Sequence, residues 1–236
     1  MFILDQSFSS KELKKIYDSE KRKGFKIEDK YPSEYSEVIS VNQDLSILRK
    51  ERATLYVERK KLVSRSLDTT KIDSDIIEKH NEIDEIKDHR ELKIIKVLDL
   101  ASKKMQEKAF SPHIHIQFDP IKKKSMYVVD NHCTFLCVKK LQNTISRLYK
   151  IKQSDRNQII SSLGTILPDH FPKRIIKADI KHFYESIDFE RLYNTLDKDW
   201  LLSHLSRNLI KEIISQYRIA SWSSLGLPRW LGISAY

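Results

Sequence analysis

The sequence predicts an α+β protein that is largely helical, with a helical hairpin near its N-terminus and a few short strands. Three observations support this fold class. Apolar residues recur at helical spacing between residues 41 and 110, and the same spacing returns between residues 189 and 217. Short apolar runs between residues 111 and 180 are typical of strands. At 236 residues and 40% hydrophobic content, the chain can form one large or two small cores.

Patterning divides the chain into four segments. We expect an N-terminal segment over residues 1–40, a helical hairpin insertion over residues 41–110, and two further segments over residues 111–170 and 171–236. Between the two helices of the hairpin, the stretch "SRSLDTTKIDSD" is rich in residues that favour turns and helix N-caps.

Three arginines lie on or near the apolar faces of the predicted hairpin, namely Arg52, Arg59 and Arg90. We therefore expect the hairpin to pack on something other than itself. Two interpretations stay open: a structural insertion without ligand contact, or a contact surface for RNA, a protein partner or a second copy of the chain.

Later elements are predicted from local patterns. Short strands are expected at "IHIQF" and "SMYVV", helices at "TFLCVKKLQNTISRLYKI" and "SDRNQIISSLGTIL", and a buried strand at "PKRIIKADI". More than one helix should then follow over residues 189–217, and either Ser186 or Asp188 can cap the first of them.

Charge favours a polyanionic partner. The chain has 43 Lys and Arg against 33 Asp and Glu, a formal net charge of +10 and a sequence pI near 9.4, which points to nucleic acid before membrane. The basic excess is largest within residues 111–170, where lysines and arginines alternate with tyrosines and apolar residues. Both a solvated helix face and a phosphate-binding surface explain that pattern.

Other sequence features narrow the function classes. No apolar run approaches the roughly 20 residues that cross a bilayer, and the N-terminus lacks the apolar core of a signal peptide, so we expect a cytoplasmic, soluble protein. Cys133 and Cys137 are expected to be buried, reduced thiols. His113 and His115 could complete a two-His, two-Cys zinc site, but the alternating "HIH" also fits an ordinary strand. Neither a GxGxxG motif nor a P-loop is present.

The stretch "IIKADIKHFYESIDF" ends an apolar run in one acid, Asp179. A carboxylate held at the end of a strand suits a divalent cation with oxygen ligands, and the backbone carbonyl of Ile180 can supply another ligand. One acid does not make a two-metal site, which needs further carboxylates. The other interpretation is that Asp179 caps a turn or pairs with Lys177 or Lys181.

Two ordered stretches resemble motifs of reverse transcriptases. "KADIKHFYESIDF" resembles their motif A, and "SSLGLPRWLGISAY", about 40 residues later, resembles their motif B. The chain is most similar to bacterial reverse transcriptases of the abortive-infection and defence-associated type. This resemblance implies that residues 111–170 form fingers and residues 171–236 form part of the palm of a right-hand polymerase.

The resemblance assigns roles by position. Asp179 matches the motif A catalytic metal ligand, with Ile180 beside it. Tyr184 matches the aromatic residue that excludes a ribose 2′-hydroxyl, with Phe183 next to it in the nucleotide pocket. The motif B turn beside template and primer corresponds to Gly226, Leu227, Pro228, Arg229, Trp230 and Ser234. Arg156 is a candidate for contacting the nucleotide, and Lys139 and Lys140 are candidates for contacting the template.

Two departures from the family pattern matter. The family's Tyr-x-Asp-Asp motif does not occur within these residues, so we expect the partner acids from a longer polypeptide. Trp230 stands where the family has a small residue, often Gly.

For the full-length protein, the resemblance implies RNA-directed DNA synthesis with Mg²⁺ as cofactor, in bacterial antiviral defence. The implied partners are an RNA template, with a dedicated non-coding RNA as one candidate, a DNA product and deoxynucleotides; no membrane contact is implied. The runner-up function is a non-catalytic nucleic-acid-binding or assembly module, and an RNA-templated RNA polymerase ranks third.

Overall fold

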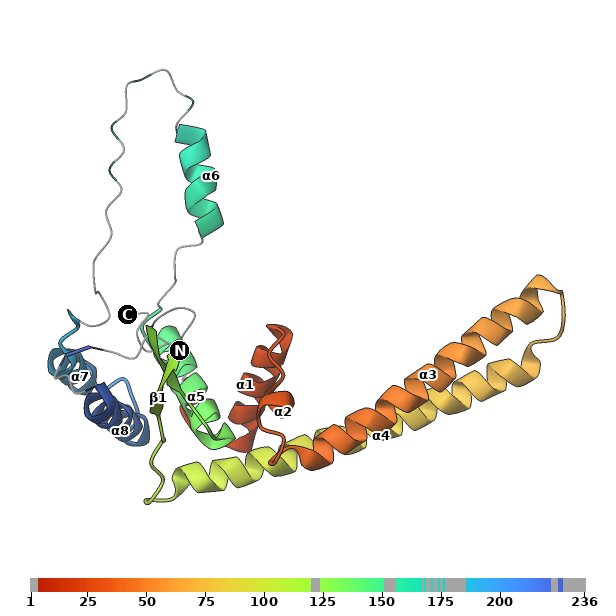
Figure 1. The fold of residues 1–236 in the computed structure, drawn as a ribbon, viewed down its shortest axis with the longest axis horizontal. Coiled ribbons are helices and arrows are strands. Elements are labelled where there is room, and N and C mark those ends of the chain that lie inside the picture. Colours follow the sequence, from red (N-terminus) through yellow and green to blue (C-terminus); the bar gives the residue numbers. More distant parts are fainter. Residues whose placement is uncertain are drawn as a thin grey trace. The chain divides into compact units, whose positions relative to one another are not determined.

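The computed structural model describes most of the chain as helices. It describes residues 4–119, 124–150, 156–166, 186–221 and 225–226, together with 168, 171, 174 and 176. The chain divides into two compact units, the first made of Phe8–Lys108 and the second of residues 1–7 and 109–236. Figure 1 shows the helices and strands of both units. Each unit is described by itself below.

The first unit begins with α1 (Ser10–Arg22) and the short α2 (Ile27–Lys30). Ser9 caps α1, because its side chain accepts a hydrogen bond from the backbone N–H of Glu12 at 3.4 Å. The helix ends where Gly24 adopts a φ of +85°, a conformation that favours glycine. Phe25 then donates its N–H back to Glu20 at 3.1 Å, which turns the chain towards α2.

A long helical hairpin follows, made of α3 (Ser36–Ser64) and α4 (Thr70–Gln106). Figure 1 shows the two helices side by side. Cross-hairpin contacts fix an antiparallel register: Arg52 lies 3.1 Å from His80, and seven residues further along α3, Arg59 donates to Asp73 at 2.5 Å, seven residues back along α4.

The core of the hairpin lies at the end near α1 and α2. All buried residues of α3 lie in its first ten positions, and two of them, Val41 and Leu45, pack with Ile83 of α4. Towards the turn, Tyr56 and Val57 are 52% and 55% exposed. The unit is therefore anchored at one end of the hairpin, while the other end presents both helices to solvent.

Arg90 of α4 is buried and joins all four helices of this unit. It donates to Asn42 of α3 at 2.6 Å, to Glu28 of α2 at 2.8 Å and to the hydroxyl of Tyr17 of α1 at 3.3 Å. The expectation that the hairpin packs on another element is thus confirmed at Arg90. Arg52 and Arg59 instead contact the opposite helix of the hairpin.

The second unit contains a two-stranded antiparallel sheet of β1 (His115–Asp119) and β2 (Lys124–Val128), with His115 opposite Val128. These are the two short strands that the sequence predicts. The sheet leads into α5 (His132–Leu148), which Asn131 caps by accepting from the N–H of Thr134 at 2.7 Å. Most of α5 is buried, so this helix is central to the unit.

Three more helices complete the second unit: α6 (Arg156–Ile166), α7 (Phe189–Lys198) and α8 (His204–Ser221). Asp188 is the cap of α7, because its side chain accepts from the N–H of Arg191 at 3.2 Å. This resolves the choice between Ser186 and Asp188. The helical pattern over residues 189–217 is therefore two helices, as predicted.

The described chain is predominantly helical, and its strands are β1 and β2. The strand expected at residues 172–180 lies almost wholly outside the described residues, so the right-hand polymerase architecture stays a prediction. Across the described ranges, no helix combines the length and apolar character needed to cross a lipid bilayer.

Candidate functional site

The predicted site residues fall into two groups. Outside the described residues lie Asp179, Ile180, Phe183, Tyr184, Leu227, Pro228, Arg229, Trp230 and Ser234. Within them lie Gly226, the two lysines Lys139 and Lys140, and Arg156, which is the first residue of α6. The contacts made by Gly226, Lys139 and Lys140 show which segments of the chain lie together.

A backbone hydrogen bond joins the two motif stretches. The N–H of Gly226, in the stretch that resembles motif B, donates to the carbonyl of Ile187, in the stretch that resembles motif A, at 2.9 Å. Gly226 has a φ of +105°, which residues with a Cβ rarely adopt. The backbone conformation therefore explains why glycine occupies this position: it allows the positive φ at which the N–H of Gly226 reaches the carbonyl of Ile187.

A hollow of about 480 Å³ lies between α7, which begins two residues after Ile187, and α8. Aromatic and apolar side chains form part of its wall, and Phe189 and Tyr193 place their ring centroids 5.8 Å apart. Two basic residues of α8, Lys211 and Arg218, line the same hollow. Aromatic rings beside cations can accept stacked bases and phosphates.

The charges of the hollow come from three side chains. Lys211 is exposed, and Arg218 lies 3.2 Å from Glu190 of α7 in a partly exposed ion pair. Sequence reasoning missed these residues, because helical periodicity alone places Lys211 and Arg218 on a solvated face. The aromatic pair of α7, four residues apart and hence on one face of the helix, is a signal for the α7 wall of the hollow but not for its α8 wall.

The two candidate lysines of α5 have different surroundings. Lys140 is 1% exposed, and its Nζ donates to the backbone carbonyl of Asp5 at 2.8 Å. Lys139 is half-buried and holds its Nζ 5.7 Å from the centre of the Phe135 ring. The Lys140 ammonium thus binds the protein's own N-terminal segment in this structure, and Lys139 is the more accessible of the pair.

The N-terminal segment also holds the loop between α7 and α8. The side-chain amide of Gln6 donates to the carbonyl of Leu201 at 2.7 Å and accepts from the N–H of Ser203 at 2.7 Å. At the start of the same loop, the hydroxyl of Tyr149 donates to Asp199, the C-cap residue of α7, at 3.3 Å. Burial, together with the nearby Asp199 carboxylate, raises the pKa of Tyr149. These contacts position α7 beside α8 and so shape the hollow.

Cys133 and Cys137 are both buried and are not joined by a disulfide, as the sequence predicts. Burial raises the pKa of the Cys137 thiol strongly, and Cys133 beside it adds to the effect. His113 and His115 gather with Asp130 rather than with the cysteines. The two-His, two-Cys combination considered from the sequence is therefore not the group that the structure brings together.

Comparison with protein-family models, with curated proteins and with solved structures found no match for this chain. The function proposed below therefore rests on the residues of this chain and on the motif resemblance.

Proposed function

We propose that this chain is the N-terminal part of an RNA-directed DNA polymerase, comprising fingers and the first half of the palm, that acts in bacterial antiviral defence. The observation that carries the proposal is the order and spacing of the two motif-like stretches around Asp179 and Gly226. The hydrogen bond from Gly226 to Ile187 supports it, because a shared site requires the two stretches to lie together.

Asp179 and Ile180 would supply ligands for Mg²⁺. A carboxylate and a backbone carbonyl are the oxygen donors that this ion prefers. Mg²⁺ held there would supply Lewis-acid activation of the primer 3′-hydroxyl and charge stabilisation for the leaving pyrophosphate. Two such ions need more carboxylates than Asp179 alone, and the Tyr-x-Asp-Asp motif of the family would provide them.

The neighbouring residues would select and orient the substrates. The Tyr184 ring, with Phe183 beside it, would exclude a 2′-hydroxyl by volume, which favours deoxynucleotides. Template and primer would contact the turn that begins at Gly226, and Arg156 of α6 would meet the nucleotide.

The hollow between α7 and α8 would add a second contact surface for RNA. Tyr193 offers a partly exposed ring that packs on the buried Phe189, and Lys211, which lines the same hollow, offers an exposed ammonium. A lysine that neutralises one phosphate contributes roughly 0.7 to 0.9 to the slope of log affinity against log salt. Lys211→Gln should therefore weaken RNA binding and lower that slope by this amount. Lys108→Gln, at an exposed lysine of the first unit, is the matched control and should leave the slope unchanged.

Primer extension tests the proposal and separates it from its alternatives. The assay uses the gene product that contains this chain together with a Tyr-x-Asp-Asp motif, an RNA template and Mg²⁺. Incorporation of deoxynucleotides is expected, and Tyr184→Ala should raise the use of ribonucleotides relative to deoxynucleotides. Preference of the wild-type protein for ribonucleotides would favour an RNA polymerase. RNA binding without any incorporation would favour the non-catalytic module.

A further inference from the structure

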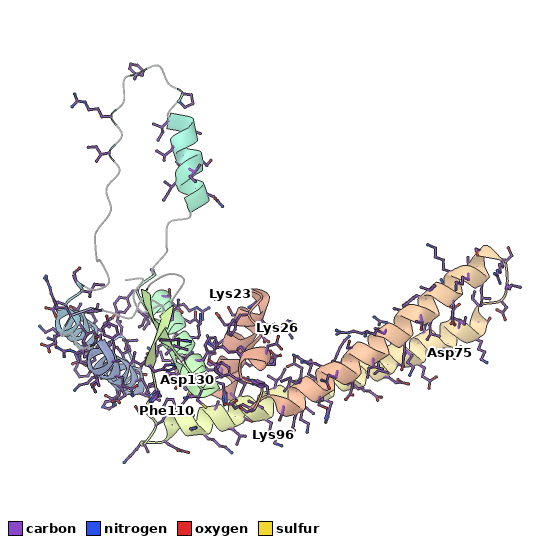
Figure 2. The ribbon with its side chains drawn as sticks, in the orientation of Figure 1. Lys23, Lys26, Asp75, Lys96, Phe110 and Asp130 are labelled. Atoms are coloured by element: carbon purple, nitrogen blue, oxygen red, sulfur yellow. The ribbon has the colours of Figure 1, made fainter. Side chains whose placement is uncertain are left out.

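Three ligand-type side chains converge at the end of the β1–β2 sheet that lies away from its turn. His113, His115 and Asp130 place one nitrogen or oxygen atom each within 4.8 Å of the others. Asp130 is labelled in Figure 2, two residues beyond the end of β2. Its carboxylate Oδ2 lies 2.7 Å from Nδ1 of His115.

The sheet register explains why these three residues meet. The antiparallel ladder ends at the pair His115–Val128, and His113 and Asp130 each lie two residues beyond that pair. Residues two apart share one face of a strand, which puts both histidines on the face of Asp130. Ile114, between them, is 5% exposed and belongs to the core.

Hydrogen bonds to two helices hold the backbone of this group. The N–H of His113 donates to the hydroxyl of Thr134 in α5 at 3.2 Å, and the N–H of Ile114 donates to the side-chain oxygen of Gln216 in α8 at 3.1 Å. The backbone that carries the histidines is thus fixed from both sides. Such support is what keeps a ligand set in place before an ion binds.

We propose that His113, His115 and Asp130 form a binding site for a divalent transition-metal ion of the zinc class. Ligands about 2.1 Å from a shared ion are at most about 4.2 Å apart, so small side-chain rotations would bring the three atoms into range. A His–Asp contact alone would account for His115 and Asp130, but it gives no reason for His113 to converge on the same point.

The ligand chemistry sets this site apart from the Mg²⁺ ligands proposed at Asp179. Imidazole nitrogens favour Zn²⁺, Co²⁺, Ni²⁺ or Cu²⁺, whereas Mg²⁺ and Ca²⁺ prefer oxygen ligands. His113 and Asp130 are exposed, and His115 is intermediate in exposure. Three protein ligands at an open surface leave a fourth position for water or for an outside ligand.

Zn²⁺ titration of the whole chain, in competition with a chromophoric chelator, tests the site. We expect one equivalent to bind and the melting temperature to rise with Zn²⁺. His113→Ala, His115→Ala and Asp130→Ala should each weaken binding by roughly tenfold or more, since even the loss of a supporting residue around a metal has an effect of that size. His89→Ala, at an exposed histidine of α4, is the control and should bind as the wild type does.

A second measurement separates loss of a ligand from loss of folding. Co²⁺ bound to the wild type should give d–d absorption bands, which the three variants should lack while keeping the wild-type circular dichroism. Absence of Zn²⁺ binding by the wild type would overturn the proposal. Binding that survives all three substitutions would also overturn it, because the ion would then be held elsewhere, for example at the cysteines.

Discussion

The backbone N–H of Gly226 donates a hydrogen bond to the carbonyl of Ile187 at 2.9 Å, across 39 positions of the sequence. Between these two residues the chain forms α7, a short loop and α8. This one bond therefore closes the helical pair and brings the motif-like stretches on either side of it together. The positive φ of Gly226 is part of that closure.

Gly226→Ala should destabilise the second unit. An alanine at a φ of +105° is strained, at about 1 to 3 kcal/mol. Gly164→Ala is the matched control, because a Cβ added at Gly164 in α6 meets nothing within 4 Å and alanine favours helix. Urea unfolding should show a loss for the first variant and no loss for the second. Equal stability of both variants would contradict the strained role of Gly226.

Lys140→Met should also destabilise the second unit, although it keeps most of the side-chain volume. The substitution removes the hydrogen bond that the buried Lys140 ammonium donates to the Asp5 carbonyl. Because the donor is charged, its loss should reduce the free energy of unfolding by about 1.5 to 3 kcal/mol. Lys139→Met, next to it on α5, should change stability less. A reversed order of the two variants would show that the buried contact is unimportant.

Arg90→Met should strongly destabilise the first unit. Losing the guanidinium leaves Glu28 buried without its charged partner, and such a change lowers the free energy of unfolding by about 3 to 5 kcal/mol. Adding Glu28→Met should recover much of the loss, because the uncompensated charge is then gone. Arg59→Met, at an exposed pair, should have little effect. If the double variant is no more stable than Arg90→Met alone, the unpaired charge of Glu28 is not the cause of the loss.

The protein should lose stability at alkaline pH because the pKa of Tyr17 is raised in the native state. Burial, and then the hydrogen bond to Glu28, raise the pKa of Tyr17 well above its ordinary value of 10.0. The native state therefore keeps the phenol protonated, whereas the unfolded chain releases the proton above about pH 10. The stability that Tyr17 contributes is complete below that pH and falls as the pH rises. Free energies of unfolding measured from pH 8 to pH 11 should fall more steeply for the wild type than for Tyr17→Phe. Parallel curves would exclude this role.

Cys133 and Cys137 should resist alkylation in the native protein. Both are buried, and the raised pKa of Cys137 suppresses the reactive thiolate. Mass spectrometry after iodoacetamide treatment should find them unmodified in buffer and modified in denaturant. Rapid labelling of either residue in buffer would show that α5 is less well packed than its burial indicates.

Local patterns predicted the local elements. Apolar periodicity gave the hairpin of α3 and α4, although α3 begins at Ser36, five residues before the predicted segment. Alternation gave β1 and β2, and a polar residue before an apolar helix gave Asp188 as a choice of cap. Each of these depends on residues a few positions apart, where spacing in the sequence determines which side chains share a face.

Long-range contacts were not predictable in the same way. A lysine in a basic run is expected in solvent, yet Lys140 is buried because a carbonyl from the far N-terminal segment reaches its ammonium. The contacts of Gln6 with Leu201 and Ser203 span nearly the whole chain. The grouping of Asp130 with His113 and His115 could be predicted only from the register of the sheet. Tertiary packing decides such contacts, and no local spacing encodes them.

The most direct test of the proposed polymerase is Asp179→Asn in the full-length gene product. Asparagine keeps the size of the side chain but removes the negative charge that a Mg²⁺ ligand needs. Primer extension on an RNA template should be abolished in the variant, while RNA affinity stays near that of the wild type, since binding depends on basic residues elsewhere. Deoxynucleotide incorporation by the variant at the wild-type rate would contradict the account.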